Sequence, residues 1–246
     1  MTDSVAIDIS RLAGHITPTS ARMVDFDDRT SFAVDVDSAV AQISTTSLTN
    51  DLNDFVFAAH DAPLKKLSAT IHGSELTLKG ILPDKGDISF ESTGTLAVTA
   101  EGMMRVHIVK VKAFHLPVKG LMDMLGLDTA KLLDTRKVEG VSVDKDDLIV
   151  DPQVILPSPR FRGRLGKIQI ENEHIALTFV SRDAKSIHPL LKNECGGRNY
   201  LQFKGGTVRF WKLTMVGVDL VLVDTDPQDS FNFAIDHYKE QLVAAN

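Results

Sequence analysis

The chain has 246 residues, enough to bury a sizeable core as one large β-rich domain or two small ones. Hydrophobic residues make up 43% and charged residues 24%, which argues against wholesale disorder. The net charge of −6 disfavours a nucleic-acid-binding protein, because neutralising phosphates needs an excess of Lys and Arg.

The N-terminal part combines strand and helix patterns. Alternation of apolar and polar residues predicts short strands over residues 5–9 and 32–36. Apolar residues at helical spacing then predict a helix over residues 46–59, with Asp51 and Asp54 on its polar side. The apolar stripe of this helix consists of Leu48, Leu52, Phe55, Val56 and Ala59.

A meander of strands is predicted next. Alternating residues predict strands over residues 67–71 and 76–78, joined by a hairpin turn with Gly73 at its first central position. Further strands follow. In the long strand predicted over residues 104–115, the apolar pattern shifts phase between Ile108 and Val109, which predicts a bulge or burial on both faces.

The remaining chain is again rich in strand patterns. A short helix is predicted over residues 118–133, from the apolar spacing of Val118, Leu121, Met122 and Leu125. Residues 138–180 are almost all strand, turn and apolar alternation. Strands are predicted once more over residues 200–224, with a hairpin turn at Gly205-Gly206, and a terminal helix follows Asp226.

These elements predict an α+β fold that is dominated by antiparallel strands and has three or four isolated helices. We expect a single β-rich domain over residues 1–246. Its core is expected at residues 34–180, with a C-terminal strand and helix extension at residues 200–246.

No residue pattern points to catalysis. The eight histidines are scattered without metal-binding spacing, and the common nucleophile and phosphate-binding motifs are absent. The acidic clusters at residues 144–147 and 224–229 are explained as a turn and a helix cap. Cys195 has no evident base to activate it and is interpreted as structural or incidental. We therefore predict no enzymatic activity, no metal site and no cofactor.

The predicted short helix carries more apolar side chains than one helix face can use, namely Leu121, Met122, Met124, Leu125 and Leu127. One interpretation is that these side chains complete the core. The other is that helices 46–59 and 118–133 line a groove for an acyl chain, a kind of site that leaves no catalytic motif. The candidate ligand-binding residues are Leu48, Leu52, Phe55, Val56, Leu121, Met122, Met124 and Leu125.

The order of the elements resembles small bacterial phospholipid-binding domains of the tubular lipid-binding (TULIP-like) superfamily. The resemblance covers residues 34–180 and rests on Gly140-Val-Ser-Val, Asp147-Leu-Ile-Val, Leu156-Pro, Gly163, Ile168-Gln-Ile and Ile175-Ala-Leu-Thr-Phe. It implies a strongly curved antiparallel sheet wrapped around a long helix, with lipid between them. It also implies a non-enzymatic protein that is often exported or membrane-anchored. The added residues 200–246 depart from the family pattern.

The function predicted from these observations is non-enzymatic binding or transport of a lipid or other hydrophobic ligand, at the cell envelope and with membrane association. No signal peptide is evident, so the periplasm or envelope is expected if a leader or anchor was removed, and the cytoplasm otherwise. The alternative is a structural or protein-interaction module without a ligand. A hydrolase-like enzyme that uses Cys195 or one of the Asp clusters ranks third.

Overall fold

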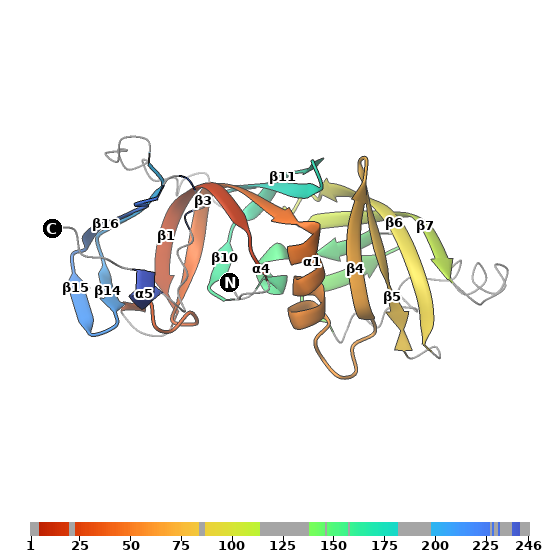
Figure 1. Ribbon diagram of the computed structural model, residues 1–246, viewed down its shortest axis with the longest axis horizontal. Coiled ribbons are helices and arrows are strands. Elements are labelled where there is room, and N and C mark those ends of the chain that lie inside the picture. Colours follow the sequence, from red (N-terminus) through yellow and green to blue (C-terminus); the bar gives the residue numbers. More distant parts are fainter. Residues whose placement is uncertain are drawn as a thin grey trace.

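The computed structural model describes residues 5–19, 23–83, 87–113, 138–145, 147–156, 158–181, 198–226, 228, 231 and 238–241. Strands hold 60% of these residues and helices 11%. The molecule is elongated, with the strands of one large sheet at one end and a long C-terminal hairpin at the other (Figure 1).

The largest sheet has six strands in the order β4-β5-β6-β7-β9-β8, and every neighbouring pair is antiparallel. Its strands are β4 (Lys65–His72), β5 (Glu75–Leu82), β6 (Ile88–Val98), β7 (Met104–Ala113), β8 (Val141–Asp144) and β9 (Asp147–Val150). The predicted turn at Gly73 joins β4 to β5 with a φ of 64°. The predicted bulge is also confirmed, because Thr93 pairs with Lys110 and Gly94 with Ile108, which leaves Val109 as the extra residue.

A second sheet runs along the middle of the molecule in the order β1-β3-β12-β11, and β10 pairs with β3 in parallel. Its strands are β1 (Asp8–Pro18), β3 (Phe32–Ser44), β10 (Arg160–Arg162), β11 (Arg164–Glu171) and β12 (His174–Val180). The short helix α4 (Pro152–Ile155) precedes β10, and Asp151 caps it by accepting a hydrogen bond from the Gln153 amide. β3 pairs with β1 over nearly its whole length. The long strand β3 runs from one end of the molecule toward the other.

The C-terminal strands form one long, kinked hairpin. Its inner part pairs β13 (Tyr200–Lys204) with β16 (Asp219–Val223), and its outer part pairs β14 (Thr207–Phe210) with β15 (Leu213–Val216). β14 also pairs in parallel with β2 (Val24–Asp25), and α5 (Tyr238–Gln241) lies nearby (Figure 1). We call β2, β13–β16 and α5 the hairpin lobe.

The prediction of a hairpin turn at Gly205-Gly206 is wrong. These glycines and Gly217 lie opposite one another where the hairpin bends, and all three have positive φ values. Hydrogen bonds from Gly205 N to Val218 O and from Gly217 N to Gly206 O carry the pairing through the bend. Glycine adopts left-handed backbone at little cost. The glycine pair therefore indicated a kink within the paired strands and not the turn that ends them.

Three apolar clusters form the core. The hairpin-lobe cluster contains Val24, Phe26, Phe32, Val34, Val36, Ala39, Val208, Phe210, Val218 and Tyr238. The inter-sheet cluster lies between the two large sheets and contains Ile43, Leu48, Ala69, Leu165, Ile175 and Leu177. The third cluster contains Leu64, Leu67, Leu82 and Phe90. The early part of β3 supplies the first cluster and its end supplies the second, so the apolar face of one strand serves both.

The predicted sheet wrapped around a long helix is wrong. Within the described ranges, the longest helical segment has 12 residues, formed by α1 (Thr45–Asp51) and the π-helix η1 (Leu52–Val56). It lies beside β4 at the edge of the six-stranded sheet (Figure 1). Sheet packs on sheet instead, because the alternating strands outnumber the helical apolar stripes. The predicted helix at residues 118–133 and the loop containing Cys195 lie outside the described residues.

Candidate functional site

The segment α1–η1 is the only described part of the predicted groove. Ser44 begins it as N-cap, with its side chain accepting a hydrogen bond from Ser47 N at 3.1 Å. After Asp51 the helix widens, and Phe57 N donates to Leu52 O at 2.8 Å, five residues back. Such π-helical turns are rare in proteins, and those that occur often lie at functional sites.

Polar side chains attach this helix to the edge strand β4. The amide of Asn53 donates to Leu67 O at 2.8 Å and accepts from Leu67 N at 2.9 Å. Thr49 Oγ1 accepts from Ala69 N at 2.9 Å. The backbone groups of an edge strand would otherwise lack partners on this side. The contacts therefore fix one face of the helix against β4, and the opposite face turns away from that strand.

The widened turn changes which of the predicted ligand-binding residues come together. Leu48 is buried in the inter-sheet cluster, and Leu52 packs against both that cluster and the third one. Phe55 and Val56 are half-buried and belong to none of the clusters described above. Phe57, which no helical stripe predicted, packs against the third cluster instead. A π turn adds one residue to the helical repeat, so the stripe moves on by one position.

The other four candidate residues fall where the structure gives no description. They are Leu121, Met122, Met124 and Leu125. Their assignment to a ligand site stays a prediction.

Asp51 is the feature of this helix that the sequence pattern placed wrongly. It was predicted on the polar side, yet its side chain is fully buried. Neither carboxylate oxygen finds a hydrogen-bond partner in the part of the chain that the structure describes. Burial, with a smaller contribution from the negative charge of Asp54, raises the pKa of Asp51 to about 6. Along the helix it is flanked by Leu48 and Leu52, so an unsatisfied polar group adjoins the inter-sheet cluster.

The inter-sheet cluster extends beyond its buried members. Further large apolar side chains pack against it and keep part of their surface exposed: Ile7, Leu52, Ile71, Leu76, Leu78, Leu96, Val98, Met104, Ile168 and Phe179. They come from η1, β4, β5, β6, β7, β11 and β12, and from the segment before β1. The segment α1–η1 and the two large sheets thus pack around this apolar cluster, and the carboxyl group of Asp51 adjoins it.

The acidic cluster at residues 144–147 forms a turn, as predicted, because Asp144 pairs with Asp147 where β8 meets β9. The described residues show no helix that begins at Asp226, so the helix cap at residues 224–229 stays a prediction. Asp147 accepts from His107 Nδ1 at 2.7 Å and lies 3.8 Å from Arg105, across the β7–β9 pair. Asp224 accepts from Asp226 N at 3.1 Å and from Asn199 Nδ2 at 3.2 Å. Across the described ranges, no three His, Cys, Asp or Glu side chains are grouped closely enough to hold a metal ion.

No helix in those ranges is long and apolar enough to cross a bilayer. The chain matches no protein-family model, and no curated protein or solved structure is detectably similar to it. The resemblance to TULIP-like domains therefore stays a prediction, without the sheet-around-helix arrangement that it implied.

Proposed function

We propose that the protein binds a lipid or another hydrophobic ligand, without catalysing a reaction, in the apolar region beside α1–η1. The observation that carries this proposal is the buried carboxyl group of Asp51, which has no hydrogen-bond partner. Binding sites for small hydrophobic molecules combine an apolar lining with a few polar anchors. In this proposal the partly exposed side chains around the inter-sheet cluster form the lining, and Asp51 is the anchor.

Asp51 also indicates the chemistry of the ligand. An unpartnered carboxyl in an apolar surrounding is costly, and a hydrogen-bond donor placed against it removes part of that cost. A carboxylate accepts hydrogen bonds and a protonated carboxyl group both donates and accepts. The ligand is therefore an amphiphile whose apolar body contacts Leu48 and Leu52 and whose hydroxyl or amine group contacts Asp51.

Two probes with the same hydrocarbon chain test this proposal. Dodecylamine carries a donor group, and the methyl ester of dodecanoic acid does not. Both are titrated, below the concentrations at which they aggregate, against a fluorescent dye bound by the protein. A charge-assisted hydrogen bond gives the amine an advantage of about ten- to a hundredfold. Asp51→Asn abolishes most of that advantage, whereas Asp54→Asn, on the exposed side of the same helix, keeps it.

Native mass spectrometry of the purified protein gives an independent readout, because a bound amphiphile adds a fixed mass. A protein that carries no ligand and binds neither probe contradicts the proposal, and supports the alternative of a structural or interaction module. Equal affinity of wild type and Asp51→Asn for both probes removes Asp51 from the site. The location at the cell envelope is proposed only by the family resemblance.

A further inference from the structure

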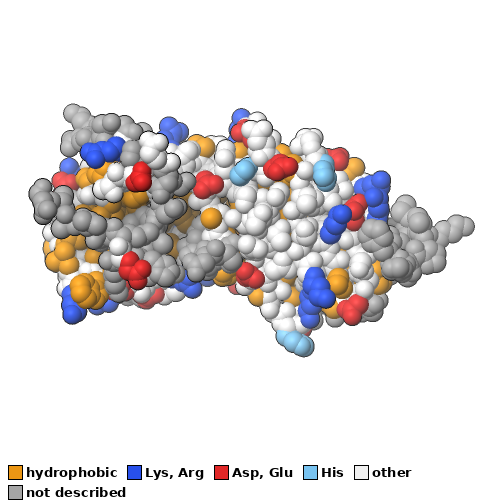
Figure 2. Space-filling model, in the orientation of Figure 1, with side chains coloured by type: hydrophobic (Ala, Val, Ile, Leu, Met, Phe, Trp, Pro, Cys, Tyr) orange, Lys and Arg blue, Asp and Glu red, His pale blue; other side chains and the backbone are white. Residues whose placement is uncertain are grey.

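The tip of the β14–β15 hairpin is the most exposed apolar feature in the described part of the chain. A two-residue turn, Trp211-Lys212, joins the two strands, and Phe210 pairs with Leu213 across it. Trp211 is 57% exposed, Leu213 59% and Val216 81%. The hairpin lies at the end of the long axis that is opposite to β5–β7 (Figure 1). Hydrophobic side chains gather at this end in the space-filling view (Figure 2).

Trp211 occupies a backbone conformation that does not suit it. Its φ is 50°, in the left-handed region where the first central position of a tight hairpin turn favours glycine. A bulky residue there costs of the order of 1–3 kcal/mol unless something compensates. The side chain is mostly exposed, so packing in the core does not compensate for that cost. Lys212 lies over the ring, with its Nζ 4.8 Å from the ring centroid.

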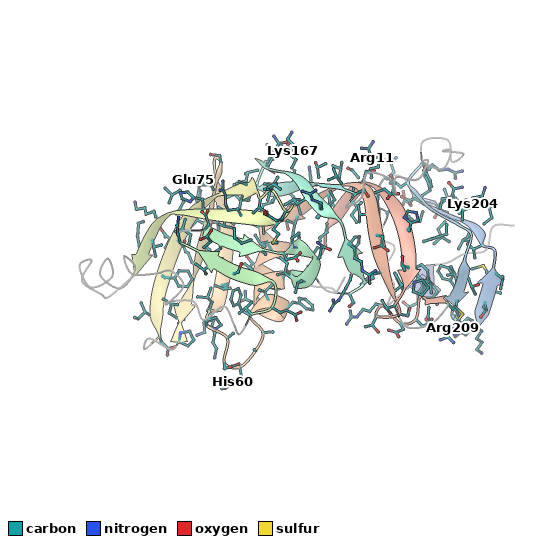
Figure 3. The ribbon with its side chains drawn as sticks, turned by 180° about the vertical axis from the view of Figure 1, so that it is seen from behind. Arg11, His60, Glu75, Lys167, Lys204 and Arg209 are labelled. Carbon is teal, nitrogen blue, oxygen red and sulfur yellow. The ribbon has the colours of Figure 1, made fainter. Side chains whose placement is uncertain are left out.

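The base of the hairpin is firmly held while its tip projects. Val208 and Phe210 point into the hairpin-lobe cluster, where the ring of Phe210 stacks on Phe26 with centroids 4.2 Å apart. On the other face of β14, Arg209 forms an ion pair with Asp25 on β2. Arg209 lies within this lobe, far from Glu75 at the other end (Figure 3). The tip is therefore presented on a rigid support.

The exposed apolar side chains lie on both faces of the hairpin. Neighbouring residues of a strand alternate between faces, so Leu213 and Val216 point in opposite directions. Leu213 adjoins the Trp211-Lys212 turn, whereas Val216 pairs with Thr207 at the end of β15 farther from the turn. A protein partner usually covers one face of such an element. A lipid bilayer, in contrast, surrounds an inserted tip on all sides.

The charge of the tip agrees with a lipid surface. Residues 207–216 contain two basic residues, Arg209 and Lys212, and no acidic residue, in a chain with a net charge of −6. Arg209 is paired with Asp25, so Lys212 is the cation beside the exposed tryptophan. Tryptophan is favoured at the interface of membranes, and a neighbouring lysine can extend to anionic headgroups.

From these observations we infer that the β14–β15 tip docks on a lipid bilayer containing anionic lipids. Trp211 and Leu213 enter the interfacial layer, and Lys212 contacts the headgroups. The inference does not rest on the ligand site beside Asp51, which lies in the other part of the molecule. Docking and ligand binding are separate properties and are tested with different variants.

Trp211 is the single tryptophan of the chain, so its fluorescence reports on the tip alone. The full chain is mixed with vesicles of phosphatidylcholine, with or without phosphatidylglycerol. We expect the emission to shift to shorter wavelength with the anionic vesicles, and lipids brominated in their acyl chains to quench it. Leu213→Asp weakens vesicle binding by roughly tenfold or more, because a charge is costly below the headgroups.

Val109→Asp is the matched control. Val109 is also 57% exposed, but it is the bulge residue of β7 at the opposite end, so this variant keeps wild-type binding. Unchanged tryptophan emission with either kind of vesicle overturns the inference, and so does sedimentation with vesicles at unchanged emission. Equal binding by Leu213→Asp and wild type overturns it as well. A shift that grows with protein concentration in the absence of lipid assigns the tip to a second copy of the chain instead.

Discussion

Replacing Asp51 by Asn should stabilise the protein in a strongly pH-dependent way. Burial raises the pKa of Asp51 from 3.8 to about 6, so the folded state disfavours the ionised carboxylate. The difference of 2.2 pKa units corresponds to about 3 kcal/mol, at about 1.4 kcal/mol per unit. The folded state binds its proton more tightly than the unfolded state. Stability of the wild type therefore falls as the pH rises from about 4 to about 6, and stays lower above that range.

The Asn side chain has a similar shape and no charge, so most of this pH dependence should disappear. Urea unfolding is followed by circular dichroism at several pH values, for ligand-free wild type and Asp51→Asn. We expect the variant to gain up to about 3 kcal/mol in its free energy of unfolding near pH 8, and to gain little near pH 4. Asp54→Asn serves as the comparison and should change little. An advantage of Asp51→Asn that is equal at both pH values, or a loss of stability near pH 8, refutes the reasoning.

Three further variants test the structural argument. Trp211→Gly should raise the free energy of unfolding by about 1 kcal/mol in thermal or urea melts, because glycine tolerates a positive φ, while vesicle binding falls. Asn53→Ala should lower it by about 1–3 kcal/mol, since both backbone groups of Leu67 lose their partner, and hydrogen exchange at the Leu67 amide should accelerate. Phe26→Ala should lower it by about 3–5 kcal/mol in urea melts by leaving a cavity beside Phe210.

The sequence predicts the strands well wherever one face is buried and the turn has its own chemistry. The β4–β5 hairpin follows from apolar alternation on either side of Gly73, and the bulge at Val109 follows from the phase shift beside it. Both signals are local, since a strand displays its burial every second residue. The choice between a sheet around a helix and two stacked sheets is not local, because it depends on which apolar faces meet.

Of the four candidate ligand-binding residues on α1–η1, only Leu48 and Leu52 pack against the apolar clusters. Leu48 and Leu52 were found because the first turns of the helix keep the regular spacing of 3.6 residues. Phe57 was missed, since the widening after Asp51 shifts the apolar stripe by one residue. Nothing in the sequence around Asp51 distinguishes a buried carboxyl from an exposed one. Burial depends on how the helix packs against segments that are distant in the sequence; Ser47, one turn before Asp51, accepts a hydrogen bond from Ala6 N in the segment before β1.

Asp51 and Trp211 are two of the places where the chain breaks rules that most of its described residues obey. One is a buried carboxyl without a partner, and the other is a large side chain on left-handed backbone. Such departures are expected at sites where a sequence is selected for function rather than for stability. Because the two residues lie in different parts of the molecule, a single substitution can remove the energetic cost at one of them without affecting the other. If both are kept for binding, Asp51→Asn should gain stability near neutral pH and lose only the preference for dodecylamine. Trp211→Gly should gain stability and lose only vesicle binding. A variant that gains stability and keeps both binding activities would show that its strain has no part in either.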